Sequence, residues 1–255
     1  MMINLNGRAI YYELHGPDLG PVVILLHHGL GMMGAWEEQI PVLAKAGFRV
    51  LAYDRWGYGK SEYRPQLLLP HFEEDQQDLL SLMRALEIQS ASLVGHSDGG
   101  TIALYIAGRH PHRVRRMVIV AAHIYVEAKM IPGIQELRRA YEREPKFQEG
   151  MRRAHGEKAE QVFQIWYGGW LKESNLDWDM RPQLEGIRCP VLVVQGMEDE
   201  HATPKHARDL AGAIPGAELW LVPESGHMLI RERAAAFNLR LLEFLRPELS
   251  GEARD

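Results

Sequence analysis

The stretch LVGHSDGG, residues 93–100, decides more about this chain than any other segment. An apolar run enters the pattern Gly-x-Ser-x-Gly, and a segment of helical composition, residues 101–109, follows at once. Strand, tight turn and helix in this order are typical of a nucleophile elbow, where strained backbone lifts the serine hydroxyl clear of the sheet. Gly95 and Gly99 leave room for that turn because side chains there would collide. The stretch therefore predicts that Ser97 is a nucleophile.

Short apolar runs alternate with helical stretches on both sides of this segment. The expected strands are residues 9–14, 22–26, 49–53, 91–94, 117–121, 191–194 and 218–222. The expected helices are residues 36–46, 71–87, 97–109, 205–213 and 231–245, and residues 247–255 are expected to form a frayed tail. This alternation predicts an α/β fold with a mostly parallel central sheet and helices on both faces.

Residues 123–187 break the rhythm, because they are helical and charged, with no run that could form a buried strand. Their aromatic residues are Tyr125, Tyr141, Phe147, Phe163, Trp166, Tyr167, Trp170 and Trp178. We interpret them as a helical cap inserted into a core of residues 1–122 and 188–255, above the strand ends where open α/β sheets bind ligands. Trp166 and Trp170 lie four residues apart on one helix face. We expect them to form part of the core of the cap or, alternatively, the wall of an acyl pocket.

Composition excludes several classes of partner. The 255 residues carry 29 basic and 34 acidic side chains, a formal charge of −5, and no basic stripe. Nucleic acid and anionic membranes are therefore not expected as partners. The expected partner is a small-molecule substrate. No apolar run reaches the ~18 residues of a membrane span. A monomer and a small homo-oligomer both remain open.

The single cysteine, Cys189, rules out an intrachain disulfide and favours a reducing compartment. Residues 1–8 lack the charged start and apolar core of a secretory signal, so a cytoplasmic location is expected.

A nucleophilic serine needs a base, and the base needs an orienting acid. In sheets of this kind the order along the chain is Ser, then Asp or Glu, then His. Glu198, Asp199 and Glu200 follow the strand at 191–194, and Asp199 is favoured because a short acid there reaches inward, leaving both glutamates solvated. The base is then His227, in the loop after the strand at 218–222.

The attack also needs two N–H donors for the developing oxyanion. We expect one from the backbone amide of Asp98, at the start of the helix after the nucleophile. The other is expected from Leu30 in the loop HHGL, residues 27–30, where Gly29 lets the backbone approach the substrate.

These motifs, over nearly the whole length, resemble those of the α/β-hydrolase family. The shared marks are His28-Gly29, the segment DRWGYGKS at 54–61, the Ser97 elbow, the Gly-x-x-Asp that ends at Asp199 and the Gly-His that ends at His227. The segments SDGG at 97–100, MVI at 117–119, AHIYV at 122–126 and Cys189-Pro190 resemble the valacyclovir hydrolase-like enzymes within the family. A tryptophan usually precedes the serine in those enzymes, whereas this chain has His96.

The resemblance implies Ser97 as nucleophile, His227 as base and Asp199 as its orienting acid, with no cofactor or metal. It implies cleavage of a carboxylic ester through an acyl-enzyme. It further implies that the Asp98 carboxylate binds the α-amino group of an amino-acid ester, since that nitrogen lies two bonds from the carbonyl carbon. The alternative for Asp98 is a favourable charge in the first turn of a helix.

Other functions remain to be weighed. An aminopeptidase or amidase and a lactonase could use the same triad, and a non-catalytic receptor could retain it. Gly29-x-Gly31-x-x-Gly34, with Asp54 20 residues beyond, matches the dinucleotide fingerprint of an NAD(P)-binding oxidoreductase. Two histidines separate that loop from its strand, however, and such an enzyme would leave the triad unexplained. His110-x-His112 and the pair His201 and His206 have no further ligand at metal-like spacing.

Overall fold

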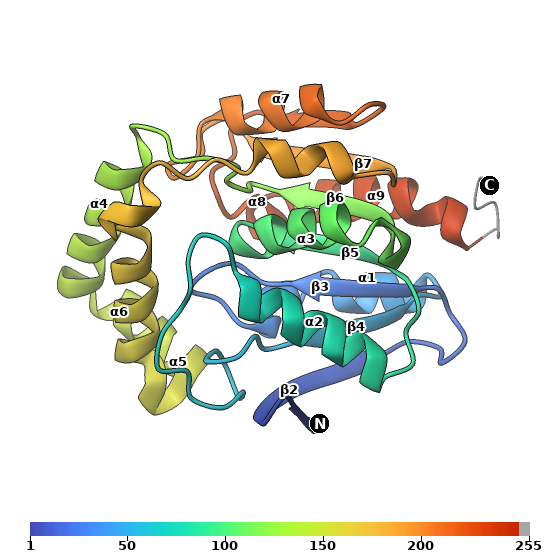
Figure 1. The fold of residues 1–255 in the computed structure, drawn as a ribbon, viewed down its shortest axis with the longest axis horizontal. Coiled ribbons are helices and arrows are strands. Elements are labelled where there is room, and N and C mark those ends of the chain that lie inside the picture. Colours follow the sequence, from blue (N-terminus) through green and yellow to red (C-terminus); the bar gives the residue numbers. More distant parts are fainter. Residues whose placement is uncertain (250–255) are drawn as a thin grey trace.

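Eight strands form a single sheet in the computed structural model, which describes residues 1–249 (Figure 1). Their order across the sheet is β1-β2-β4-β3-β5-β6-β7-β8. The strands are β1 (Met2–Leu5), β2 (Arg8–His15), β3 (Val22–Leu26), β4 (Arg49–Tyr53), β5 (Ala91–His96), β6 (Val114–Val120), β7 (Val191–Gly196) and β8 (Glu218–Val222). β2 pairs antiparallel with both β1 and β4, and all the other neighbouring strands pair parallel. The predicted mostly parallel sheet is confirmed, with β1 as an unpredicted addition.

Helices cover both faces of the sheet, which explains why its central strands are continuous apolar runs. In β3, Ile24 and Leu26 point into one core cluster and Val23 and Leu25 into the other. The first cluster is covered by α2 (Glu73–Ala85), α3 (Asp98–Arg109) and α7 (Pro204–Ala213). The second is covered by α1 (Ile40–Lys45), α8 (Leu229–Glu232) and α9 (Ala234–Leu245).

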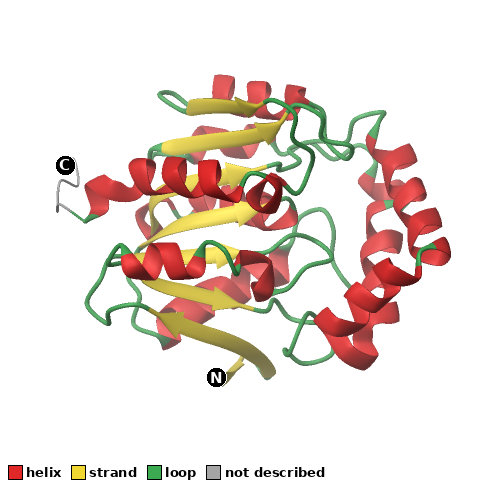
Figure 2. Ribbon diagram, turned by 180° about the vertical axis from the view of Figure 1, so that it is seen from behind, coloured by secondary structure: helices red, strands yellow, loops and turns green. Residues whose placement is uncertain are grey.

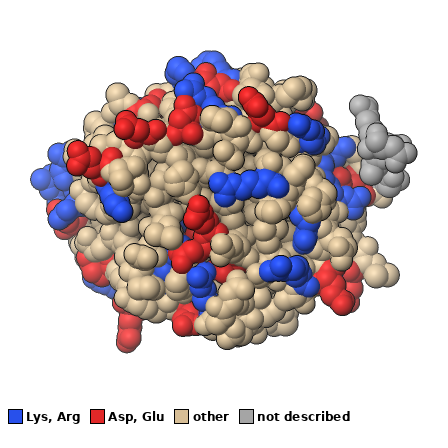
Figure 3. Space-filling model, in the orientation of Figure 1, with Lys and Arg blue, Asp and Glu red and all other residues tan. Residues whose placement is uncertain are grey.

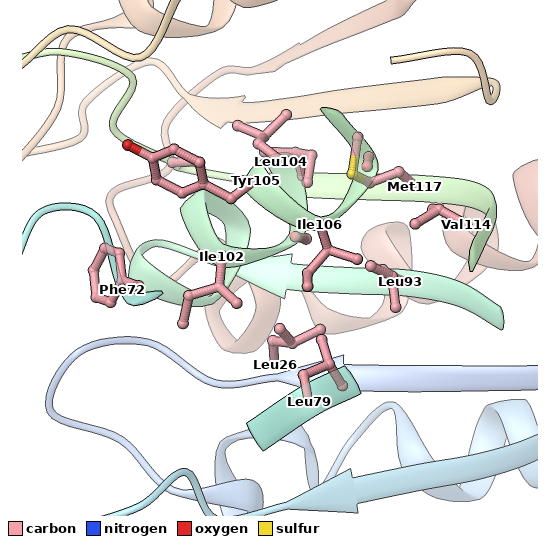
Figure 4. Close-up of a cluster of buried hydrophobic side chains, with 14 of the residues drawn as sticks. Leu26, Phe72, Leu79, Leu93, Ile102, Leu104, Tyr105, Ile106, Val114 and Met117 are labelled. Atoms are coloured by element: carbon pink, nitrogen blue, oxygen red, sulfur yellow. The ribbon is translucent and has the colours of Figure 1, made fainter. Parts of the chain in front are cut away.

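The first cluster anchors the helix that follows Ser97. Figure 4 shows Ile102 and Ile106 of α3 packed above Leu26 of β3 and Leu93 of β5. From residue 98 to residue 107 every residue of α3 is buried. Burial of this extent stabilises the helix through the hydrophobic effect and fixes its first turn against the strand ends.

Two predicted helices are shorter than expected. A helix was expected over residues 36–46, but Trp36 is the last residue of a 3-10 turn, Met33–Trp36. The helix α1 starts only at Ile40, with Pro41 in its first turn. The predicted helix 231–245 is divided at Arg233, whose non-helical backbone separates α8 from α9. The Arg233 guanidinium donates to the carbonyl of Glu224 at 2.7 Å, which holds the break in place.

The expected frayed tail was wrong for its first residues. Arg246–Glu248 form a 3-10 turn, and the Glu248 carboxylate is 8% exposed and pairs with Arg115 at 2.8 Å. The rest of that prediction, residues 250–255, lies outside the described residues.

The segment between β6 and β7, residues 123–187, carries three main helices: α4 (Met130–Arg143), α5 (Pro145–His155) and α6 (Ala159–Trp170). We call it the helical insertion. It lies beyond the carboxyl ends of the strands (Figure 2). Its internal packing buries Tyr141, Met151 and Phe163 together with Tyr58 from the core. The division of the chain into two domains at these boundaries stays a prediction.

On the face of the molecule drawn in Figure 3, acidic and basic side chains lie interspersed. Within residues 1–249, no helix combines the length and apolar character needed to cross a membrane.

Candidate active site

Ser97 lies at the sharp bend between β5 and α3. Its φ of 53° is in the left-handed region, an unusual conformation for a residue with a side chain. A Cβ at Gly95 would lie 2.4 Å from the carbonyl oxygen of Gly99, and one at Gly99 would lie 2.2 Å from that of Leu26. Both glycines are therefore required by close backbone approach. The strain at Ser97 is held by the buried strand before it and the buried helix after it.

His227 and Asp199 come together from the loops after β8 and β7. His227 Nδ1 donates to Asp199 Oδ2 at 2.8 Å, and Gln195 Nε2 donates to the same oxygen at 2.6 Å. The other oxygen, Oδ1, accepts from the backbone N–H groups of His201 and Ala202. The carboxylate is thus fully hydrogen-bonded, with one oxygen aimed at the imidazole.

Electrostatics favour the charged forms of this pair. Burial alone would raise the pKa of Asp199, but the His227 ring and the backbone donors outweigh it and hold that pKa well below its usual range. Burial alone would lower the pKa of His227, but the Asp199 carboxylate outweighs it and raises that pKa. The ring is therefore a stronger base than a free histidine, and it shares a pocket with Ser97.

Two neighbours hold the backbone of His227, and the sequence did not predict either role. The buried His96 ring donates from Nε2 to the His227 carbonyl at 2.9 Å, which fixes His96 as the Nε2–H tautomer. Glu200 is exposed, as predicted, but its Oε2 accepts the His227 backbone N–H at 3.1 Å, so it is not merely solvated. Glu198 is exposed. The only sequence signal was the unusual histidine before the serine.

Leu30 and Asp98 both line the pocket beside Ser97. Within residues 1–249, neither residue's backbone N–H donates to another group, so both are free to bind a ligand. Asp98 is the first residue of α3, where the amides of a helix point outward along its axis. The loop before Leu30 is closed by a hydrogen bond from Gly31 N–H to the His28 carbonyl at 3.1 Å.

The Asp98 side chain is only 2% exposed. Trp166 of α6 donates from Nε1 to its Oδ2 at 3.1 Å, and Arg55 Nη2 lies 3.7 Å from that same oxygen. Within residues 1–249, Oδ1 has no hydrogen-bond donor. A Cβ at Gly29 would lie 2.0 Å from Trp166 Nε1 and 2.6 Å from Asp98 Oδ2, so this site requires glycine. Burial raises the pKa of Asp98 to about 6 although Arg55 opposes it.

A chain of buried ion pairs lies behind Asp98. Arg55 pairs with Asp75 at 3.1 Å, and Asp75 also pairs with Arg64 at 2.8 Å. The complete cluster is Arg8, Arg55, Arg64, Glu74, Asp75, Asp78 and Asp98. It contains three cations and four carboxylates, which leaves one negative charge uncompensated when all are ionised. Sequence reasoning did not find this cluster, because its members are scattered through ninety residues.

These residues open onto a pocket of about 520 Å³. That volume lies within the range of small-molecule sites. The core supplies its polar end, with Ser97, Asp98 and His227. The helical insertion supplies an apolar wall, with Met130, Ile134, Leu137, Phe147 and Met151. Trp170 is 2% exposed and belongs to the first core cluster, half-buried Trp166 packs against that cluster, and both residues line the pocket.

The glycine-rich loop has a different role from a dinucleotide fingerprint. It leads into the 3-10 turn Met33–Trp36 and not into a helix whose N-terminus could hold a pyrophosphate. Asp54, the predicted ribose ligand of that alternative, instead accepts the backbone N–H groups of Met33 and Lys60, each at 2.8 Å. Within residues 1–249, no group of three or more His, Cys, Asp or Glu is arranged to hold a metal ion.

Comparisons with known proteins agree with this geometry. Residues 21–164 match the family model described as alpha/beta hydrolase fold. The chain is 31% identical to the serine hydrolase BPHL of Homo sapiens, over 95% of this chain and 85% of that protein. It is 30% identical to a putative carbamate hydrolase RutD of Caulobacter sp. (strain K31), over 96% and 97%. The solved enol-lactonase from Burkholderia xenovorans LB400 is similar with a TM-score of 0.79 and 28% identity, covering 96% of this chain and all of that one.

Proposed function

The chain belongs to the alpha/beta hydrolase fold family, and on that premise we propose that it cleaves carboxylic esters through a serine-bound acyl-enzyme. The observation that carries the proposal is the 2.8 Å hydrogen bond between His227 and Asp199, made in a pocket that Ser97 also lines. Similarity to a serine hydrolase along nearly the whole chain supports it.

The proposed reaction has two halves. His227 Nε2 takes the Ser97 proton while Oγ attacks the ester carbonyl, and Asp199 stabilises the imidazolium that results. The amides of Leu30 and Asp98 bind the oxyanion, and His227 then protonates the departing alcohol. Water, activated by the same ring, hydrolyses the acyl-enzyme and releases the acid. Each step uses groups of this chain alone.

We further propose α-amino-acid esters as the leading substrate class. The Oδ1 atom of Asp98 lacks a donor, and the cluster of three arginines and four carboxylates to which Asp98 belongs has one negative charge in excess when all are ionised. A substrate ammonium at Oδ1 supplies both the missing donor and the missing positive charge. The neighbouring Ser97 would then meet the carbonyl carbon two bonds away.

A lactonase is the second candidate, since a cyclic ester needs the same chemistry. The similarity to an enol-lactonase and the apolar pocket wall favour it. An amidase or aminopeptidase would use the same triad and the same Asp98.

For the cell, we propose a cytoplasmic enzyme, a monomer or small homo-oligomer. Burial raises the pKa of the single thiol, Cys189, to about 11, so it is not a nucleophile at neutral pH.

The test uses two benzyl esters that differ by one group, those of phenylalanine and of 3-phenylpropanoic acid. The wild type should turn over both repeatedly, with a higher kcat/KM for the amino ester, and Ser97→Ala should lose at least ~10⁴-fold on both. Asp98→Asn keeps the backbone amide and should lower only the preference for the amino ester. Absence of multiple turnover on either ester or on a lactone panel would refute the hydrolase proposal and favour a non-catalytic receptor.

A further inference from the structure

We propose that His155, which belongs to the helical insertion, is a positioning residue of the oxyanion hole because it fixes the backbone of Leu30. The inference rests on the proposed function, in which the Leu30 amide binds the oxyanion. The helical insertion then contributes to the chemical step, by orienting an oxyanion donor, as well as covering the substrate.

The hydrogen bonds of His155 leave no ambiguity about its protonation. The ring ends α5 and is 3% exposed. The backbone N–H of Gly59 donates to Nδ1 at 3.0 Å, so Nδ1 carries no proton. The proton is therefore on Nε2, which donates to the carbonyl of Leu30 at 3.1 Å. Burial lowers the pKa of His155 to about 4, so this neutral tautomer persists at neutral pH.

Few other hydrogen bonds restrain the Leu30 backbone, although its side chain packs against the apolar cluster of Tyr141, Met151 and Phe163. Upstream, the carbonyl of His28 accepts from His27 Nδ1 at 2.8 Å and from Gly31 N–H at 3.1 Å. Downstream, Asp54 Oδ1 holds the Met33 amide. Between these anchors, within residues 1–249, the His155 ring is the hydrogen-bond partner of the Leu30 backbone. Its loss would leave the peptide unit between Leu30 and Gly31 held by the Gly31 bond to His28 alone, and the adjoining Leu30 amide would be less firmly oriented.

The ring itself is rigidly held. Tyr58 packs edge-on against it at 5.9 Å between centroids, and Lys158 Nζ donates to the carbonyls of Tyr58 and Ser61. Gly59, which supplies the Nδ1 partner, has a φ of +48°, and a Cβ there would lie 2.1 Å from Asp54 Oδ2. The core turn from Asp54 to Ser61 therefore holds the His155 ring in the orientation in which Nε2 meets the Leu30 carbonyl.

An oxyanion donor works only when it is preorganised, since it must lie 2.7–3.1 Å from the developing charge without rearranging during the reaction. Removing such a donor costs roughly 10²–10³ in kcat. Releasing one that can still swing into place should cost less, about 10- to 50-fold. The effect should fall on kcat, because the oxyanion forms after the substrate is bound.

Two variants separate the two nitrogens. In His155→Asn the amide can take the place of Nδ1 toward Gly59, but nothing reaches Leu30. In His155→Gln the longer side chain brings an N–H to the place of Nε2 and restores the donor to Leu30. We expect His155→Asn to lose about 10- to 50-fold in kcat on both benzyl esters, with KM within twofold. We expect His155→Gln to stay within about threefold of the wild type.

A second readout isolates transition-state binding. 2-Phenylethylboronic acid forms a tetrahedral adduct with a nucleophilic serine and places an oxygen where the oxyanion forms. Its inhibition constant should rise in His155→Asn by about the factor lost in kcat and stay near the wild-type value in His155→Gln. Thermal unfolding of both variants provides the stability control.

Equal losses in the two variants, or failure of both to fold, would overturn the inference, because the ring would then matter for packing alone. A KM effect without a kcat effect would also overturn it. These outcomes leave the proposed function intact as long as the wild type turns over esters and Ser97→Ala does not. Undiminished hydrolysis by Ser97→Ala would instead refute the proposed function and this inference with it.

Discussion

The two sides of the pocket are built in different ways. On the core side, Ser97, Asp199 and His227 each follow directly from a parallel strand, so the sheet alone brings them to one edge. On the insertion side, Trp166 and His155 reach the site from separate helices, and they bond to core residues, Trp166 to Asp98 and His155 to Gly59 and Leu30. Packing against the sheet fixes the core side, whereas the two insertion side chains that reach Asp98 and Leu30 act on them through polar contacts.

The difference suggests a division of labour. The core would supply the groups that break the ester bond. The insertion would modify their action through two contacts, that of Trp166 with Asp98 and that of His155 with Leu30. Changes to Ser97, Asp199 or His227 on the core side should therefore abolish turnover on every ester. Changes on the insertion side should alter selectivity or slow one step while leaving the reaction possible.

The largest effect among variants on the core side beyond Ser97 is expected for Asp199→Asn. The amide presents a different partner to His227 Nδ1 and favours the wrong tautomer, which should lower kcat by about 10⁴-fold on both benzyl esters. Glu198→Gln is the matched control, since this exposed side chain makes no hydrogen bond or ion pair among residues 1–249, and it should leave kcat within twofold. An Asp199→Asn enzyme with near wild-type kcat would remove Asp199 from the triad.

A smaller effect is expected from pH, and it separates the two regions without mutation. The pKa of Asp98 is about 6, so the carboxylate loses its charge as pH falls through that value. Protonation of His227 slows both benzyl esters and cancels in the ratio of their kcat/KM values. The ratio of amino to des-amino ester should therefore fall about tenfold per pH unit well below 6. A ratio that is independent of pH between 5 and 7 would contradict amine binding by Asp98.

The smallest effect should come from Trp166→Phe. Phenylalanine keeps most of the ring but lacks the N–H that donates to Asp98 Oδ2, so the carboxylate is both less fixed and more easily protonated. We expect the amino-ester ratio to fall about three- to tenfold at pH 6.5, mainly through KM, which corresponds to the loss of one modest hydrogen bond.

Trp178→Phe is its control. It removes another buried indole hydrogen bond, to Tyr105 at 2.9 Å, from a residue that packs on Trp170 but does not itself line the pocket. It should lower the melting temperature without changing the ratio. Equal changes of the ratio in both variants would show that Trp166 acts through general stability.

The candidate residues of the core side could be found in the sequence because the patterns that indicate them are local. A glycine-flanked serine, an acid just past a strand and a histidine in the next loop are each recognisable within six residues. Gly29 and Leu30 likewise follow from a short loop after β3.

The insertion side could not be predicted in this way. The bond between Trp166 and Asp98 joins residues 68 positions apart, and that between His155 and Leu30 spans 125. Neither tryptophan nor histidine in an amphipathic helix indicates which core atom it will meet. For the same reason, the sequence did not reveal the hydrogen bonds of His96 and Glu200 to the backbone of His227, or the cluster of charges behind Asp98.

The most direct test of the central claim is to identify the labelled residue after reaction with a fluorophosphonate, followed by mass spectrometry of the intact and digested protein. One adduct per chain on Ser97 is expected, formed at a rate that Asp199→Asn sharply reduces, with loss of ester hydrolysis in proportion to labelling. Full ester hydrolysis by a protein that remains unlabelled, or labelling of a different residue with the same loss of activity, would contradict the account.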